Sequence, residues 1–303
     1  MKKDSAIIFD IQRFSLHDGP GIRTTVFFKG CQLECQWCHN PESWRAYAEH
    51  SFRESRCVGC DQCIENCPKQ AISIIDNRPV TEMNKCKLCG RCADTCLACA
   101  REIIGREMTV GEIMAGIEQD VIFYDESGGG VTISGGEPLM QPEFLLAILN
   151  QCQRQRIHTA VDTSCYAEPK IVEMVGEKAD MFLCDIKHMD SEIHERFTGV
   201  GNNLILENIR RISKAGKKII IRIPVIPGFN DEKANIEATG KFTASLPGVT
   251  RVDILPFNRG GKEKSARLTA QNKHLQVETP NEEQMNSIAK NLSKYGFEVK
   301  IGG

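Results

Sequence analysis

Residues 30–41 read Gly-Cys-Gln-Leu-Glu-Cys-Gln-Trp-Cys-His-Asn-Pro and directly follow the apolar run 24–28. Cys31, Cys35 and Cys38 therefore have the spacing C-x3-C-x2-C in a loop after a predicted strand, and α/β folds build their sites in such loops. Three thiolates hold three irons of a cubane, whereas clusters that only transfer electrons normally have four cysteines. The fourth iron could then take a ligand, as catalytic zinc does. The alternative is a structural zinc knuckle that also uses His39.

The downstream run 131–138, Val-Thr-Ile-Ser-Gly-Gly-Glu-Pro, argues against the zinc knuckle. A short β-branched run ends in two glycines, an acid and a proline. We expect Gly135 and Gly136 to let the backbone approach a ligand closely, and Glu137 to accept a hydrogen bond from an ammonium group.

Together and in this order, the two motifs resemble the radical S-adenosylmethionine (SAM) superfamily. The resemblance implies that the amino and carboxylate groups of SAM complete the coordination of the fourth iron. It also implies that the glycine-rich strand end holds the methionyl amine, and that an electron from the 4Fe-4S cluster cleaves SAM to a 5′-deoxyadenosyl radical. The cofactor would carry the chemistry, while the protein supplies geometry and excludes water.

Length and composition are those of an ordinary globular protein. The 303 residues suffice for one large domain and a small insert, and 41% are hydrophobic and 26% charged. The net charge of −2 favours neither nucleic acid nor an anionic membrane as partner. The sequence has no secretory segment and no run of 18 apolar residues, so we expect a cytoplasmic protein.

Fifteen cysteines are far more than average, and most of them are grouped at metal-ligand spacings. In a long chain without a signal segment this grouping predicts iron–sulfur ligation and an anaerobic or reducing setting. Four cysteines stand outside the motifs: Cys99, Cys152, Cys165 and Cys184.

Residues 51–105 contain two C-x2-C-x2-C-x3-C runs and resemble bacterial two-cluster ferredoxins, in which the fourth cysteine of each run ligates the other cluster. Segments 71–75 and 79–80 fit a small hairpin. Leu97 replaces the usual proline, and Cys99 could compete as a ligand. Paired zinc sites are the alternative, and in either case metal must hold so short a stretch together. The resemblance implies one 4Fe-4S cluster on Cys57, Cys60, Cys63 and Cys96, and another on Cys67, Cys86, Cys89 and Cys92.

Residues 17–24 read His-Asp-Gly-Pro-Gly-Ile-Arg-Thr, which by itself predicts only a turn. Beside the cluster loop, however, it resembles the signature of the activating enzymes of glycyl-radical enzymes, of which the pyruvate formate-lyase activating enzyme is the best-known member. The resemblance implies an oxidoreductase whose protein substrate is a glycyl-radical enzyme, with Asp18 meeting the glycine loop of that substrate. A ferredoxin or flavodoxin would donate the electrons.

Outside the insert, strands and helices alternate, which implies parallel pairing with right-handed crossovers. Six β/α units are too few for a closed barrel and fit the partial (β/α)6 barrel of the superfamily, an α/β fold. This barrel would comprise residues 1–50 and 106–303, with the ferredoxin-like domain at 51–105. The predicted strands are 24–28, 131–134, 157–163, 180–187, 218–224 and 249–256, preceded by 6–12; the predicted helices start near 109 and cover 141–155, 169–178, 203–215, 232–245 and 281–294.

Polar residues at the strand ends complete the predicted site. Such carboxylates often only cap helices or pair with cations. The resemblance instead implies that Asp162, Thr163 and Asp185 surround a monovalent cation beside SAM. It places Lys187 and Arg222 near SAM or the radical precursor. The SAM contacts that it implies are Trp37, Gly135, Gly136, Glu137, Asp162, Thr163, Asp185, Lys187, Arg222 and Asn258, and the catalytic set is Cys31, Cys35, Cys38, Asp18 and Lys187. At Asn258 the family usually has histidine, and asparagine can hydrogen-bond but cannot carry charge.

Two other functions compete with an activating enzyme. A radical SAM enzyme that acts on a small metabolite or a peptide would share the cluster and SAM motifs but would not need the 17–24 signature. A ferredoxin-like electron carrier would need only residues 57–96, and it would leave the barrel and the open iron unexplained. The sequence does not identify the partner enzyme.

Overall fold

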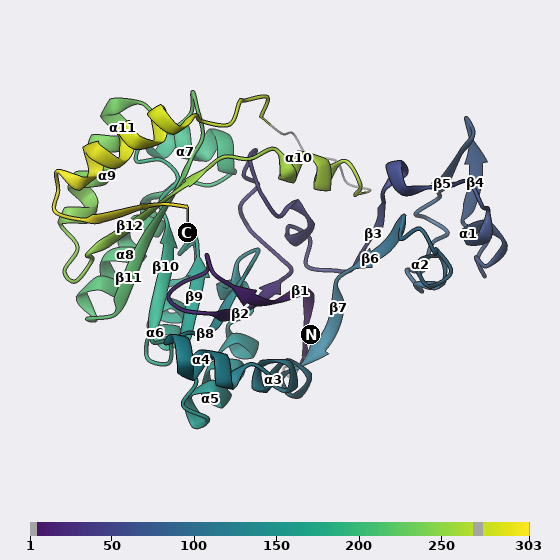
Figure 1. Ribbon diagram of the computed structural model, residues 1–303, viewed down its shortest axis with the longest axis horizontal. Helices are drawn as coiled ribbons and strands as arrows, with labels where there is room; N and C mark the ends of the chain where they lie inside the picture. Colours follow the sequence, from purple (N-terminus) through teal and green to yellow (C-terminus); the bar gives the residue numbers. More distant parts are fainter. Residues whose placement is uncertain (1–4, 269–274, 303) are drawn as a thin grey trace.

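The computed structural model describes residues 5–268 and 275–302 and is built around a nine-stranded sheet (Figure 1). Residues 1–4, 269–274 and 303, which the expected domain boundaries include, lie outside the described part. Seven neighbouring strands run parallel to one another. In sheet order these are β13 (Glu298–Ile301), β12 (Arg251–Pro256), β11 (Lys218–Val225), β10 (Met181–Asp185), β9 (Thr159–Thr163), β8 (Gly130–Gly135) and β2 (Arg23–Phe28).

The sheet ends on two antiparallel strands. β1 (Ser5–Ser15) pairs with β2, and β7 (Arg106–Thr109) pairs with residues 5–8 of β1. The rest of β1 has β2 as its single partner strand among the described residues.

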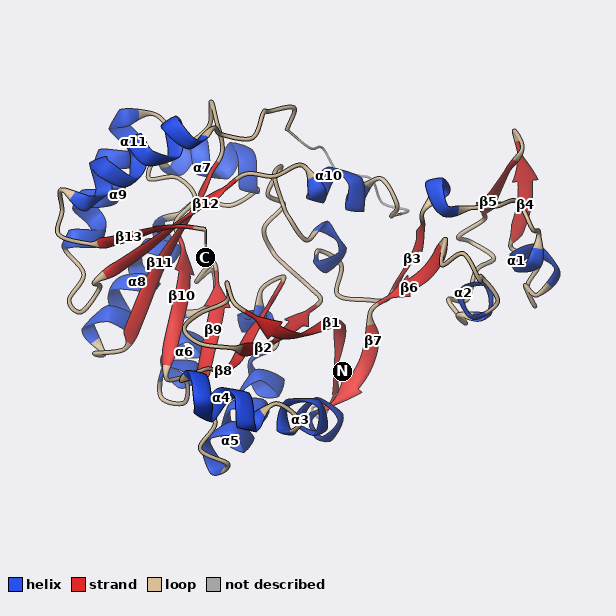
Figure 2. Cartoon of the chain, viewed as in Figure 1, coloured by secondary structure: helices blue, strands red, loops and turns tan. Residues whose placement is uncertain are grey.

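Helices cover the outer face of the parallel strands (Figure 2). Apolar side chains of both layers form the main core, because each helix presents an apolar stripe to strands that are buried on both faces. Thr109 and Asn281 cap two of the helices with reciprocal capping boxes, as the sequence predicts at Thr109. The helices of the barrel are α3 (Val110–Glu118), α4 (Val121–Ser127), α5 (Pro142–Arg154), α6 (Pro169–Gly176), α7 (Ser191–Thr198), α8 (Asn203–Lys214), α9 (Lys233–Ala244), α10 (Gly260–Ser265) and α11 (Glu282–Ser293). Of these, α10 does not cover the outer face but lies against residues 40–42, after the first cysteine motif.

The six predicted β/α units and the partial barrel are confirmed. The sequence reading missed the seventh parallel strand, β13, because its four residues are mostly exposed and carry no core pattern. It also missed α4, α7 and α10, which have only six to eight residues and so fall short of the window over which an apolar helical pattern can be recognised.

The cysteine-rich insert projects from the barrel on a two-stranded neck, β3 (Glu49–Phe52) with β6 (Arg101–Ile104) (Figure 1). Beyond the neck lie α1 (Gln62–Glu65), α2 (Arg91–Asp94) and the predicted hairpin, β4 (Ile72–Ile75) with β5 (Arg78–Thr81). Ala71 and Ile72 are buried there, but most of the hairpin is exposed. So small a core cannot stabilise the insert without metal.

Within residues 5–268 and 275–302, no helix combines the length and apolar character that crossing a bilayer requires.

Candidate functional site

A cavity of about 810 Å³ lies on the inner side of the sheet, at the carboxyl ends of the parallel strands. Its walls come from the loop after β2, the ends of β8 to β12, the first half of the chain's β1–β2 turn and the neck of the insert. Of the site residues predicted for the barrel, thirteen line this cavity: Asp18, Cys31, Cys35, Trp37, Cys38, Gly135, Gly136, Asp162, Thr163, Asp185, Lys187, Arg222 and Asn258. Glu137 is not among the lining residues.

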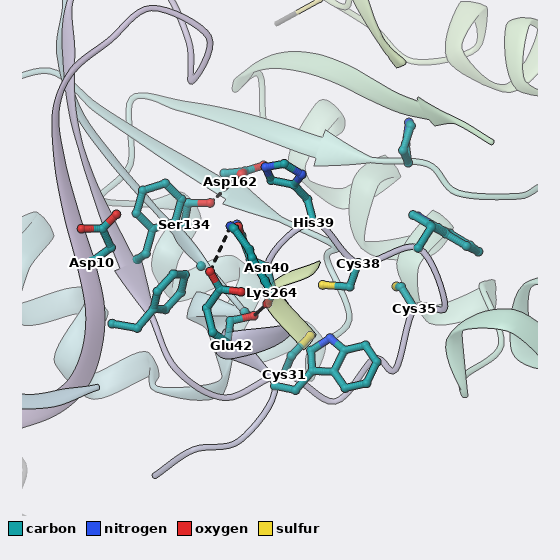
Figure 3. A pocket seen from close by; sticks show the side chains of 18 of the residues that line it. Asp10, Cys31, Cys35, Cys38, His39, Asn40, Glu42, Ser134, Asp162 and Lys264 are labelled. Atoms are coloured by element: carbon teal, nitrogen blue, oxygen red, sulfur yellow. Dashed lines mark hydrogen bonds and ion pairs between the residues drawn. The ribbon is translucent and has the colours of Figure 1, made fainter. Parts of the chain in front are cut away.

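Cys31, Cys35 and Cys38 lie along one side of the cavity (Figure 3). Burial raises the pKa of all three thiols, that of Cys35 to about 12, because a thiolate is poorly solvated there. A cation that binds thiolates would supply the missing compensation, since the thiolate is the metal ligand. The three buried thiols therefore fit an iron–sulfur cluster with one iron left for another ligand.

Backbone hydrogen bonds and aromatic packing hold the cysteine loop. The amide of Glu34 donates to the Thr198 carbonyl at 2.7 Å, and that of Gln36 donates to the Phe197 carbonyl at 3.1 Å. The Trp37 ring packs on Phe229 with 4.4 Å between centroids. Because the last two residues of α7 (Ser191–Thr198) accept these bonds, the loop is fixed relative to the far side of the barrel.

The two glycines of the second motif serve the chain's own packing. A Cβ at Gly135 would come within 2.3 Å of the Phe28 backbone, and one at Gly136 within 2.2 Å of the Gly30 carbonyl oxygen. The Glu137 amide also donates to the Gly30 oxygen, at 2.8 Å. These contacts hold the end of β8 against the start of the cysteine loop. The two glycines are therefore required by contact between two segments of the chain, whereas the sequence predicts close approach to a ligand.

Glu137 lies fully buried and has protein partners for both carboxylate oxygens. It accepts from the hydroxyls of Thr163 at 2.7 Å and Ser164 at 2.5 Å, and from the amides of Ser164 and Leu139. Burial raises its pKa and these hydrogen bonds oppose the rise. Glu137 thus ties the ends of β8 and β9 together beneath the cavity.

The carboxylates at the strand ends face cationic side chains. Arg222 Nη1 lies 3.3 Å from Asp162 and 3.9 Å from Asp18, and Lys187 Nζ lies 2.6 Å from Asp185. Burial raises the pKa of Asp162 to about 6, although Arg222 opposes the rise. Burial also disfavours the charge of Lys187 and Arg222, but nearby acidic groups outweigh it and raise both pKa values. These groups are Asp185 and Cys35 at Lys187, and mainly Asp162 and Asp185 at Arg222.

The sequence reading missed several polar residues of the site. The Ser134 hydroxyl donates to Asp162 at 2.7 Å (Figure 3). Lys264 of α10 pairs with Glu42 and donates to the Asn40 side chain, both at 2.9 Å, and so fastens α10 to the cysteine loop (Figure 3). Ser134 could have been noticed inside its motif, whereas Lys264 lies 224 residues from Asn40 and follows no pattern.

Asn258 lines the cavity beside α10. Its side-chain oxygen accepts from the Gly260 amide at 3.0 Å. Burial lowers the pKa of His39, and the nearby Asn258 side chain opposes that shift. The position where the family usually has histidine therefore lies between the end of β12, the start of α10 and His39 of the cysteine loop.

In the insert, two hollows are each lined by four cysteines. One is lined by Cys57, Cys60, Cys63 and Cys96, and the other by Cys67, Cys86, Cys89 and Cys92. These are the two crossed sets that the ferredoxin resemblance implies, and Cys99 lines neither hollow. Among the described residues, no three His, Cys, Asp or Glu side chains converge closely enough for a single metal ion.

The α/β fold and the three cysteines grouped at its cavity define a radical SAM protein. Residues 83–237 match the radical SAM superfamily, and residues 17–77 match a 4Fe-4S single cluster domain. A radical SAM methyltransferase from Sphaerobacter thermophilus has a similar fold over 92% of this chain and 66% of its own, with a TM-score of 0.55 at 13% identity.

Proteins with higher sequence identity to this chain show which group of radical SAM proteins it belongs to. The trans-4-hydroxy-L-proline dehydratase activating enzyme of Clostridioides difficile is 42% identical over 98% of this chain and 99% of its own length. The isethionate sulfite-lyase activating enzyme of Oleidesulfovibrio alaskensis is 43% identical over 89% of both chains. A domain of a pyruvate-formate lyase-activating enzyme from Bacteroides vulgatus is 40% identical, with a TM-score of 0.50 over 58% of this chain and 99% of that one. The chain belongs to the activating enzymes of glycyl-radical enzymes, within the radical SAM superfamily.

Proposed function

We propose that this chain removes a hydrogen atom from a glycine Cα of a partner glycyl-radical enzyme and leaves a radical there. When bound, the reduced 4Fe-4S cluster on Cys31, Cys35 and Cys38 and its SAM ligand supply the 5′-deoxyadenosyl radical that takes the hydrogen. The observation that carries the proposal is one cavity that brings these three thiols together with Asp18 of the signature turn.

Several residues act by position. Gly135, Gly136 and Glu137 hold the cysteine loop against β8, so the cluster and the strand end that receives SAM keep a fixed separation. Asp18 accepts from the Thr25 hydroxyl at 2.8 Å and thereby faces the cavity, where it would meet the substrate glycine loop. Such positioning is the main protein contribution when the cofactor is intrinsically unselective.

Lys187, Arg222, Trp37 and Asn258 would complete the SAM site, because all four line the cavity. Asp162 and Asp185 line the cavity together with Thr163, and each of these two carboxylates faces a cationic side chain, Arg222 or Lys187. A monovalent cation held by Asp162, Asp185 and the Thr163 hydroxyl would add positive charge beside the SAM carboxylate. The sulfonium of SAM is the competing source of that charge.

The insert, residues 51–105, would form a domain with two further 4Fe-4S clusters. The two four-cysteine hollows support this assignment over paired zinc sites, because a cubane spreads its ligands more widely than one ion does. We assign these clusters to the relay of electrons from a ferredoxin or flavodoxin to the catalytic cluster.

The partner would be one of the glycyl-radical enzymes that similar activators serve. Relatives named for trans-4-hydroxy-L-proline dehydratase, isethionate sulfite-lyase, (2S)-3-sulfopropanediol dehydratase and 4-hydroxyphenylacetate decarboxylase are 41–43% identical to this chain, so identity does not separate them.

The test incubates the reconstituted protein anaerobically with SAM, a reductant and each of these four enzymes in turn. Electron paramagnetic resonance should show a persistent glycine-centred radical in one of them, and α-deuterated glycine in that enzyme should transfer deuterium to 5′-deoxyadenosine. If deuterium comes only from a free small metabolite, the chain is instead a radical SAM enzyme that acts on that metabolite.

A further inference from the structure

Four large apolar side chains are exposed where β1 meets α4. Phe14 is 50%, Leu16 59%, Ile122 66% and Phe123 37% exposed. The Phe14 and Phe123 rings meet edge to face with 5.0 Å between centroids. Ile122 directly precedes Phe123 in the chain, and Leu16 follows Phe14 by two residues. We call this group the rim patch. Contiguous exposed apolar groups of this kind mark interaction sites, whereas single exposed ones do not.

The backbone at Phe14 is strained, and this conformation directs the Phe14 ring into the rim patch. Phe14 has a φ of 59°, a left-handed conformation that is a genuine outlier for a bulky residue. The pairing of β1 with β2 also slips there, since three steps on β1 from Gln12 to Ser15 oppose two on β2 from Thr25 to Arg23. Such a bulge re-aims a side chain, and strain of this kind concentrates at functional sites.

The patch is also held rigid. Arg13 forms an ion pair with Asp120, the residue just before α4, and its guanidinium lies 5.3 Å from the centre of the Phe14 ring. Asp120 is buried and accepts a further hydrogen bond, at 2.6 Å, from the Thr24 hydroxyl. These contacts connect β1, β2 and α4, so the aromatic rings need little ordering when a partner binds.

The rim patch is continuous with the cavity. Ser15, Leu16, His17 and Asp18 all line the cavity, and Leu16 is also mostly exposed, so it stands at the cavity mouth. Phe14 lies two residues before Leu16, at the bulge of β1. A polypeptide that reaches Asp18 from outside therefore has the rim patch beside its path.

We propose that the rim patch is the docking surface for the glycyl-radical enzyme, which contacts it with an apolar surface next to its glycine loop. The inference rests on the proposed function, because that function supplies the macromolecular occupant. The patch has the composition of an interface centre, with aromatic rings and a stacked arginine whose charge is already paired. A single aromatic residue at such a centre often contributes a tenfold or larger factor in affinity.

The test uses the substitutions Phe14→Asn and Ile122→Gln in the cluster-loaded, full-length protein. Asparagine tolerates a positive φ and glutamine is a good helix former, so neither change should unfold the protein. Met174→Ser on α6 is the matched control, because Met174 is similarly exposed, at 41%, but lies on an outer helix. Affinity for each of the four candidate partner enzymes is measured with SAM present, together with KM for radical formation.

We expect both variants to bind the partner about tenfold more weakly and to raise KM for it by a similar factor. With a nine-residue peptide that contains the glycine, KM and the rate of SAM cleavage should stay as in the parent protein, because the peptide is too short to cover the patch. The Met174→Ser protein should match the parent in every assay.

Two results would overturn the proposal and can be told apart. If the parent protein binds and activates a partner but Phe14→Asn and Ile122→Gln leave its affinity unchanged, the patch is not the docking surface while the proposed function stands. If the parent protein binds none of the four enzymes and yields no glycine radical, then neither a glycyl-radical enzyme as the partner of the rim patch nor the proposed function is correct.

Discussion

Replacing Gly136 with alanine should damage the catalytic site through a contact between two backbones. The new Cβ would stand 2.2 Å from the Gly30 carbonyl oxygen and 3.0 Å from that of Ser43. Contacts under 3.0 Å are essentially absent from real structures, so the Gly30 oxygen must retreat by about 0.8 Å, from 2.2 to 3.0 Å. Cys31 follows directly in the chain and must move with it.

The energetic cost has two parts. Overpacking of a tight site costs about 1–3 kcal/mol. The retreat also weakens the hydrogen bond from the Glu137 amide to the Gly30 oxygen, now 2.8 Å long, and such a bond contributes about 1 kcal/mol. We therefore expect Gly136→Ala to lower the free energy of unfolding by about 2–4 kcal/mol.

Urea unfolding under anaerobic conditions measures the stability, and iron analysis with the visible absorbance of the cluster measures the site. Gly136→Ala should lose about four iron per chain, since one cubane has four. Gly111→Ala is the matched control: it lies in α3 with no atom within 4 Å of the new Cβ, and alanine there should stabilise by about 0.5–1 kcal/mol. A Gly136→Ala protein with parental stability and iron content would refute the reasoning.

Three further predictions follow from the same structure. Cys96→Ser should lower the iron content from about 12 per chain to about 8, while Cys99→Ser should leave it unchanged, because Cys96 lines a four-cysteine hollow and Cys99 does not; equal loss in both would contradict the assignment. Asp162→Asn should weaken SAM binding, measured by calorimetry, and make activity independent of potassium or sodium. If the response to these ions is unaltered, Asp162 does not bind a cation, and its role is the ion pair with Arg222. His194 is buried with a pKa of about 4 in the folded protein, lowered mainly by burial, against about 6.5 when unfolded. The unfolded chain therefore binds the extra proton between pH 6.5 and 4, and the free energy of unfolding should fall by about 1.4 kcal/mol per pH unit as the pH drops through that window; His194→Asn should remove this contribution, and an unchanged slope of stability against pH would count against it.

Local chemistry allowed the sequence to predict much of this molecule. The spacing of Cys31, Cys35 and Cys38 and the Gly-Gly-Glu-Pro run lie within short segments, so the chain itself sets their separation. Alternating apolar periods marked the six β/α units, because buried parallel strands and amphipathic helices differ in period. The crossed cysteine sets of the insert also followed from spacing and resemblance, and the two hollows group the same residues.

Only the tertiary structure shows the contacts between residues that are far apart in the chain. The clash that makes Gly136 necessary is with Gly30, and the hydroxyl partners of Glu137, Thr163 and Ser164, lie at the end of the next strand. Lys264 donates to Asn40, 224 residues away in the chain. The strain at Phe14 arises from its register against β2, and its contact with Phe123 spans 109 residues of chain. Side-chain period and motif spacing carry no information on such pairs, because the closing of the sheet alone determines which strand ends and loops meet.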